Sequence, residues 1–168
     1  MKSWLRERWP RQSRPLKTSS FLIDDVILKL MRLKAKGFCC AQMILILALK
    51  AQGKTNTDLV RSAGGLCFGI NWSGEVCGAL SGGACVLSLY AGKGGDDEAS
   101  DDRTMTMVGE LVDWFGREAG EYGGKRCNEI LERFPDRSIC GRIVADTYKK
   151  CMDILMSHGF DPAVGKIG

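Results

Sequence analysis

Residues 64–95 read GGLCFGINWSGEVCGALSGGACVLSLYAGKGG, and the fold of the chain depends on them. A glycine-rich loop leads to Cys77, after which small and apolar residues follow with helical spacing. Gly78 and Gly82 lie four residues apart and share one face of that helix with Cys85. Two glycines inside a helix cost about 2 kcal/mol relative to alanine. We therefore expect another backbone, or a bound group, to approach this face very closely.

Cys77 is predicted to lie at the N-terminus of this helix. The positive end of the helix dipole lowers the pKa of a thiol, so one interpretation is a reactive or metal-binding sulfur. The other interpretation is a tight crossing of two helices that buries a small cysteine. For this segment alone the two interpretations have equal weight.

Helical spacing recurs along the rest of the chain, and no long stretch alternates with period two. The segments that show it are residues 21–36, 38–52, 58–65, 75–92, 96–115, 125–134 and 136–155. The acidic residues from Asp96 to Asp102 suit a first helical turn, and residues 116–124 are predicted to be a glycine-interrupted connection. The sequence predicts an all-α fold, a compact bundle of five to seven helices joined by Gly-rich loops.

Length, composition and charge indicate one globular domain. The chain has 168 residues, 45% of them hydrophobic, and a net charge of +4. Much of the positive charge lies in the first 17 residues, so we predict a flexible basic arm over residues 1–19 and a single helical domain over residues 20–168. The near-neutral remainder predicts no nucleic-acid binding. The absence of a long apolar run predicts no transmembrane segment, and with no secretory signal the chain is predicted to be cytoplasmic.

Eight cysteines are many for a cytoplasmic chain, where they ligate metals or carry redox chemistry more often than they form a disulfide framework. No CxxC pair, CxxCH haem attachment motif or zinc-finger spacing is present, so a site must be assembled from separate helices. The four candidates each follow a glycine or a turn at a predicted helix start, where thiolate is favoured: Cys40, Cys77, Cys127 and Cys140. The other cysteines away from helix starts are interpreted as core residues: Cys67, Cys85 and Cys151.

Four segments resemble one known family in their order: GFCCAQ, GEVCGALSGG, RCNEIL and ICGRIVAD. The sequence is similar, from about Asp25 to Leu155, to the redox-active proteins named for their C-GCAxxG-C-C pattern. The central element reads Cys77-Gly78-Ala79-Leu80-Ser81-Gly82, the first family cysteine matches Cys40, and the third and fourth match Cys127 and Cys140. Cys39 stays an alternative to Cys40, and Cys151 an alternative to Cys140. Cys39 and Cys40 point about 100° apart on a helix and are not expected to serve one site together.

The resemblance implies a redox role. A similar domain accompanies haem in split-Soret-type cytochromes, which implies that Cys40, Cys77, Cys127 and Cys140 ligate an iron–sulfur cluster and pass electrons to a redox partner protein. Two alternatives are a metal-free thiol–disulfide protein with Cys77 as its reactive thiol, and a non-redox helical interaction module with structural cysteines or zinc. Glycine-lined helix faces also allow a homodimer. The one histidine, His158, is predicted to interact with a helix C-terminus rather than to catalyse a reaction.

Overall fold

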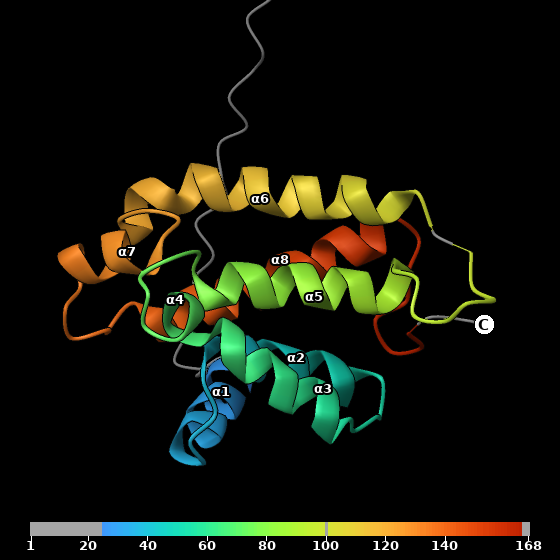
Figure 1. Ribbon diagram of the computed structural model, residues 1–168, viewed down its shortest axis with the longest axis horizontal. Helices are drawn as coiled ribbons and strands as arrows, with labels where there is room; N and C mark the ends of the chain where they lie inside the picture. Colours follow the sequence, from blue (N-terminus) through green and yellow to red (C-terminus); the bar gives the residue numbers. More distant parts are fainter. Residues whose placement is uncertain (1–24, 100, 166–168) are drawn as a thin grey trace, which may run out of the picture.

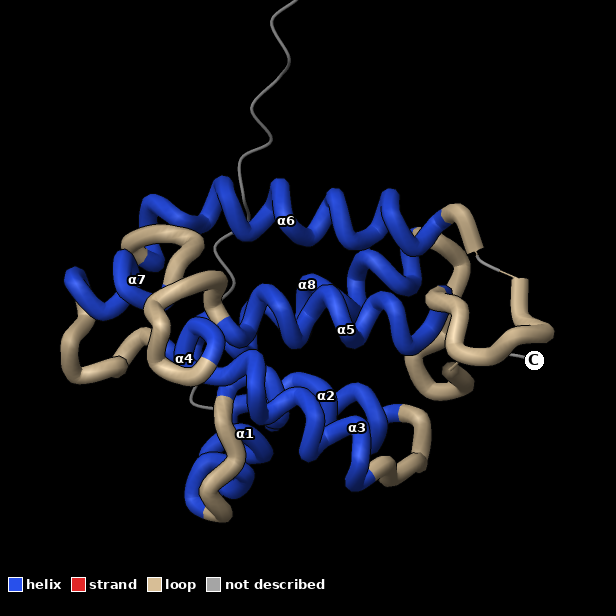
Figure 2. The backbone as a smooth tube through the Cα atoms, viewed as in Figure 1, coloured by secondary structure: helices blue, strands red, loops and turns tan. Residues whose placement is uncertain are grey.

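The computed structural model describes residues 25–99 and 101–165, so the predicted arm over residues 1–19 lies outside the described residues. The described part is all-α, as predicted, and Figure 2 shows only helices and loops in it. Seven right-handed helices are present in these ranges: α1 (Asp25–Ala35), α2 (Cys40–Ala51), α3 (Thr57–Ser62), α5 (Gly78–Ala91), α6 (Arg103–Tyr122), α7 (Cys127–Arg133) and α8 (Cys140–Ser157). The 3₁₀ turn η1 (Ala63–Leu66) and the short segment α4 (Cys67–Ile70) connect α3 to the loop before α5. The division into an arm and one domain stays a prediction.

The helices form three layers in Figure 1. α6 lies along one side, α5 and α8 occupy the middle, and α2 lies on the other side with α1 and α3. α5 contacts α2, α6 and α8 and is therefore the central helix. α4 and α7 contact each other beside the first turn of α5. The N-terminal end of α5 is thus the place where segments far apart in the sequence meet.

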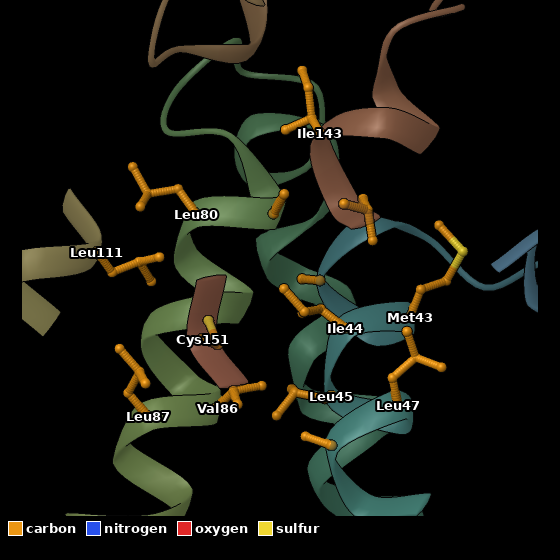
Figure 3. Packing of buried hydrophobic residues seen from close by; sticks show 14 of the residues in the cluster. Met43, Ile44, Leu45, Leu47, Leu80, Val86, Leu87, Leu111, Ile143 and Cys151 are labelled. Atoms are coloured by element: carbon orange, nitrogen blue, oxygen red, sulfur yellow. The ribbon is translucent and has the colours of Figure 1, made fainter. Parts of the chain in front are cut away.

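The crossing of α2 and α5 is as close as the glycine spacing predicts. A Cβ atom at Gly82 would lie 2.6 Å from Ile44 Cγ2 and 2.9 Å from Ala41 Cα, so a side chain there would collide with the α2 backbone. Figure 3 shows the two helices side by side, with Ile44, Leu45 and Val86 filling the space between them. All three side chains are fully buried. Gly82 therefore supports the interpretation of this helix face as a tight helix crossing.

A second face of α5, about 100° around the helix, packs on α6 and α8 at Gly83. A Cβ atom there would lie 2.9 Å from Leu111 Cδ2, 3.0 Å from Thr147 Cγ2 and 3.1 Å from Cys151 Sγ. These contacts belong to one hydrophobic core that includes residues of most of the helices. α5 is consequently buried on two faces, which explains why small residues such as glycine and alanine are found along it.

α6 differs from the prediction at both ends. It begins at Arg103, not at the acidic cluster, and the Asp101 carboxylate accepts the Arg103 backbone N–H at 3.0 Å from outside the helix. Acidic residues that precede a helix can cap it without entering it. α6 also continues through Gly116 to Tyr122, because an apolar face that includes Phe115 and Tyr122 is buried against the core. The predicted connection over residues 116–124 is therefore reduced to its last two residues.

Two smaller predictions concern the membrane and His158. None of the helices in the described residues is long and apolar enough to cross a membrane.

His158 lies directly after α8, where its Nε2 atom is 2.8 Å from Glu110 Oε1. The side chain thus joins the C-terminal end of α8 to α6.

Candidate functional site

One apolar pocket lies where the helices meet at the N-terminal end of α5. Its volume is about 300 Å³. The four cysteines singled out in the sequence all line it, and they come from four different helix starts: Cys40, Cys77, Cys127 and Cys140. Cys77 is 8% exposed, and the other three are half-buried. Thiols that are up to 100 residues apart in the chain thus face a single cavity.

The loop before α5 and the loop before α7 hold Cys77 and Cys127 next to each other. The Cys127 N–H donates to the Glu75 carbonyl oxygen at 2.7 Å, and the Cys77 N–H donates to the Lys125 carbonyl oxygen at 3.0 Å. Arg126 and Glu75 add an ion pair of 3.1 Å across the same two segments. These two hydrogen bonds fix both cysteine backbones before their side chains enter the pocket.

The lack of a side chain at Gly78 leaves room for the Cys40 sulfur at the pocket. A Cβ atom on Gly78 would collide with Cys40 Sγ and would lie 3.0 Å from the Leu66 carbonyl oxygen. The glycine that follows Cys77 in the sequence motif therefore leaves room for the sulfur of α2. This contact explains the CGAxxG pattern physically: its first glycine accommodates a cysteine, and its last accommodates the α2 backbone.

Burial controls the acidity of Cys77. It raises the pKa of this thiol from 9.0 to about 12, although the backbone N–H groups of Ala79 and Leu80 act in the opposite direction. The helix N-terminus thus lowers this pKa as predicted, but the net shift in the metal-free protein is upward. The helix start is present, but the loss of water around the sulfur outweighs it.

The pocket thiols also affect one another. Burial first, and then the charge of neighbouring pocket cysteines, raise the pKa of Cys127 and Cys140. Arg137 lowers both pKa values, and Lys34 lowers that of Cys140. These two cations are the charged side chains among the described residues that line the pocket. The wall thus carries positive charge and no carboxylate, and it is suited to a group with negative charge.

A disulfide joins Cys39 to Cys67, a pairing that no cysteine spacing in the sequence predicts. Their Cα atoms are 6.0 Å apart, and 28 positions separate them in the chain. Cys67 is buried as predicted, but it is bonded rather than a free core thiol. Cys39 lines the pocket next to Cys40, but Cys39 is bonded to Cys67 whereas Cys40 is a free thiol. Cys39 precedes α2 in an extended conformation (φ −98°, ψ 176°), so the expected angle of about 100° between helical neighbours does not apply to this pair.

The segment after Cys67 forms a left-handed turn. Five consecutive residues, 68–72, have φ between 50° and 70°. Backbone hydrogen bonds from Asn71 to Cys67 (2.8 Å) and from Trp72 to Phe68 (3.1 Å) close it. The Phe68 and Trp72 rings stack at 4.2 Å, and the Arg137 guanidinium lies 4.2 Å from the centre of the Trp72 ring. Phe68 and Arg137 both line the pocket, so this turn forms part of its wall.

The sequence does not predict the left-handed turn, because most of its residues do not favour this conformation. L-residues in this conformation cost about 1 kcal/mol or more each, and only glycine and asparagine adopt it readily. Gly69 and Asn71 are the two residues in the turn whose types favour a left-handed conformation. At Gly69 a side chain is also excluded, because a Cβ atom would lie 2.6 Å from Cys127 Cβ. The turn is therefore held by its packing on α7.

The two remaining cysteines lie away from the pocket. Cys151 is fully buried in the middle of α8, with its Sγ 3.6 Å from the Gly83 carbonyl oxygen. Cys85 is half-buried in the middle of α5. Neither lines the pocket, so the structure places Cys140, not Cys151, beside the other three candidates.

The pocket thiols surround a space and do not meet at one point. Within residues 25–99 and 101–165, no three His, Cys, Asp or Glu side chains are grouped closely enough to hold a single metal ion. A group of several atoms holds its thiolates farther apart than one ion does. The donor type and the donor number are those of a thiolate-bound cluster, which four cysteines hold in proteins.

Sequence comparison identifies the family. The model of a family described as "Putative redox-active protein (C_GCAxxG_C_C)" matches residues 38–154, which is more than half of the chain. The chain belongs to this family. The matched region includes all eight cysteines, and it contains the disulfide and most of the residues that line the pocket. No curated protein matches the chain, and no solved structure does. A redox-active protein of the C_GCAxxG_C_C family thus has its characteristic cysteines around one pocket.

Proposed function

We propose that this redox-active protein transfers electrons through an iron–sulfur cluster bound by Cys40, Cys77, Cys127 and Cys140. The observation that carries the proposal is the convergence of these four cysteines, from four helix starts, on one apolar pocket. Thiolate sulfur is the ligand that iron–sulfur clusters use, and four is their usual number of ligands. When bound, the cluster would supply one-electron redox chemistry.

The acidity of the thiols supports a bound metal centre over metal-free chemistry at Cys77. With its pKa raised to about 12, the Cys77 thiol is protonated at neutral pH and is a weak nucleophile. A coordinating metal replaces the proton of a thiol, so it offsets the cost that burial imposes. Burial therefore argues against Cys77 as a free reactive thiol, and a bound metal would take the place of its proton.

The composition of the pocket wall supports the same function. Its lining is mostly apolar, with Phe38, Phe68 and Ile143 among the contributing residues. Arg137 and Lys34 on the wall would partly balance the negative charge of four thiolates. Burial and nearby charge are the two properties by which a protein adjusts the reduction potential of a cluster.

The Cys39–Cys67 disulfide favours a second candidate, thiol–disulfide chemistry without metal. Cys39 and Cys67 supply an oxidised pair, and Cys40 supplies a free thiol beside it. This candidate is weaker because Cys67 is only 2% exposed and the pKa of Cys77 is high. The interaction-module and structural-zinc alternatives rest on no specific observation. The redox partner protein, a homodimer, the cytoplasmic location and the absence of nucleic-acid binding stay predictions.

Anaerobic reconstitution with iron and sulfide tests the main proposal. The expected result is stoichiometric iron and acid-labile sulfide, with visible absorption near 400 nm that dithionite bleaches. The same sample is assayed for zinc, since a colourless zinc protein would contradict the proposal. A colourless, metal-free protein whose thiols oxidise reversibly would instead support the thiol–disulfide candidate.

A further inference from the structure

The Cys39–Cys67 disulfide is positioned as part of the pocket, not as a remote crosslink. Cys39 lines the pocket and directly precedes Cys40 at the start of α2. Cys67 directly precedes Phe68, which lines the same pocket from the left-handed turn. The disulfide therefore connects two walls of the cavity that the four free thiols face.

Both sulfurs have hydrogen-bond acceptors that only the reduced pair can use. Cys39 Sγ lies 3.2 Å from Gln42 Oε1, and Cys67 Sγ lies 3.7 Å from the Ala63 carbonyl oxygen. A disulfide sulfur carries no proton, whereas each thiol of a reduced pair donates one hydrogen bond. The surroundings thus already satisfy the dithiol, and reduction leaves no buried donor without an acceptor.

The position of Gln42 is fixed by other contacts, so its acceptor is present in both redox states. Its Oε1 atom accepts the Cys39 N–H at 3.3 Å, and its Nε2 atom donates to the Val60 carbonyl oxygen at 3.2 Å. Gly64 leaves room for this side chain, since a Cβ atom there would lie 3.3 Å from Gln42 Nε2. The amide is thereby held with its oxygen toward Cys39.

The disulfide is largely buried, and one of its two cysteines lies on the pocket wall. Cys67 is 2% exposed, and Cys39 is half-buried on the pocket wall. A protein thiol from solvent therefore reaches this bond poorly, whereas a small dithiol can enter the pocket of about 300 Å³ that Cys39 lines. Electrons that arrive at Cys40 are one residue away from the disulfide along the chain. We propose that Cys39–Cys67 is a redox-active disulfide that exchanges two electrons with the centre bound by the pocket cysteines. This proposal rests on the proposed function, because the electrons reach the disulfide through that centre.

The step is a two-electron reduction that is balanced by two protons. The S–S bond breaks, each sulfur takes up one electron and one proton, and two thiols form. A one-electron carrier protein supplies the electrons in two successive transfers through the pocket, and the protons come from water at the pocket mouth. Oxidation reverses each of these changes. The reduced pair of thiols thus stores two electrons beside a one-electron centre.

Counting thiols in the metal-free protein tests the disulfide itself. The protein is equilibrated in a series of oxidised and reduced dithiothreitol mixtures, quenched with acid, unfolded, alkylated and weighed by mass spectrometry. We expect six alkylated cysteines at the oxidising end and eight at the reducing end, with a reversible transition that peptide mapping assigns to Cys39 and Cys67. A count that changes only when the protein unfolds would show a structural disulfide and would overturn the proposal.

Counting electrons in the reconstituted protein tests the exchange with the centre. Dithionite should deliver two more electrons to the wild-type protein than to the Cys39→Ala/Cys67→Ala variant, with the same iron content in both. The Cys39→Ser/Cys67→Ser variant repeats the comparison, and Cys85→Ala, which changes a cysteine outside the pocket, should match the wild-type electron count. Equal counts in the wild-type and double-variant proteins would overturn the exchange.

The two proposals fail in different ways. If no centre forms, the proposed function and the route of the electrons are lost together, while the thiol count still reports whether the disulfide is reversible. If the centre forms and the thiol count stays at six under all reducing conditions in the folded protein, only the disulfide proposal is overturned.

Discussion

The two cysteines of α8 show how position within a helix changes the environment of the same side chain. Cys140 begins the helix, lines the pocket and is half-buried among other thiols. Cys151 lies eleven residues later, is fully buried and packs against Gly83 of α5. α5 repeats the pattern, with Cys77 at its start and Cys85 in its middle. Helix starts converge on a cavity where a group can bind, whereas helix middles cross so closely that only packing is possible.

The largest effect expected from this difference concerns metal loading. Cys77→Ala and Cys127→Ala should each lower the iron content after anaerobic reconstitution about tenfold, because each removes one of four sulfur ligands. Cys85→Ala and Cys151→Ala are the matched controls and should keep the wild-type iron content. Iron and sulfide assays on all four proteins give the result. Equal iron content in the two pairs of variants would show that the pocket cysteines bind iron no better than the core cysteines.

The next largest effect concerns the disulfide that ties α2 to the left-handed turn. Cys39→Ala/Cys67→Ala should lower the free energy of unfolding of the metal-free protein by about 3 kcal/mol, since the bond closes a loop across 28 positions. Urea denaturation followed by circular dichroism measures it. The reduced wild-type protein should lose a similar amount. An unchanged midpoint would show that packing alone holds the pocket wall.

The helix crossing is tested with a single methyl group. Gly82→Ala should lower the free energy of unfolding by about 2 kcal/mol and Tm by about 6 °C, because the added Cβ atom collides with the α2 backbone. Gly109→Ala is the control, since Gly109 is exposed on α6 and a Cβ atom there has nothing within 4 Å. That variant should be neutral or more stable. If Gly82→Ala is as stable as Gly109→Ala, the crossing is not tightly packed.

The smallest effect expected is a pH dependence that comes from the buried thiols. Burial raises the pKa of Cys151 from 9.0 to about 12, as it does for Cys77. Below pH 9 these thiols are protonated in both the folded and the unfolded chain. Between pH 9 and about pH 12 the unfolded chain releases their protons first, so stability falls with rising pH by about 1 kcal/mol per pH unit for each thiol.

Cys151→Ala isolates one of these thiols. Urea unfolding of the metal-free protein at several values between pH 8 and pH 10 should give a shallower loss of stability for this variant than for the wild-type protein. Parallel curves would mean that Cys151 ionises in the folded chain as readily as in the unfolded one.

Much of the helical architecture was predictable because it depends on local patterns. Apolar spacing located most of the helices, and a turn or glycine before each of four cysteines placed them at helix starts. The glycine spacing around Gly82 correctly indicated a close approach of another backbone. Such features depend on residues within a few positions of each other, which a sequence displays directly.

The features that were not predictable depend on contacts between distant segments. No spacing rule pairs Cys39 with Cys67, because the pairing follows from how η1 and α4 pack beside α2. The net shift of the Cys77 pKa was predicted in the wrong direction because burial is a property of the whole fold. α6 begins later than its acidic residues suggest. Acidic residues are common both just before a helix and in its first turn, so the sequence does not distinguish the two positions.

The left-handed turn at residues 68–72 has a consequence for the order in which the molecule assembles. Most of its residues disfavour this conformation when the chain is unfolded, so the turn forms only after the α7 segment is in place against Gly69. Those two segments are far apart in the chain, which makes their meeting slow compared with the formation of any helix. We expect the pocket wall to be completed last during folding. A newly made chain would then pass through a stage in which its helices are formed and the pocket of cysteines is still open. We expect a cofactor of several atoms to enter at this stage.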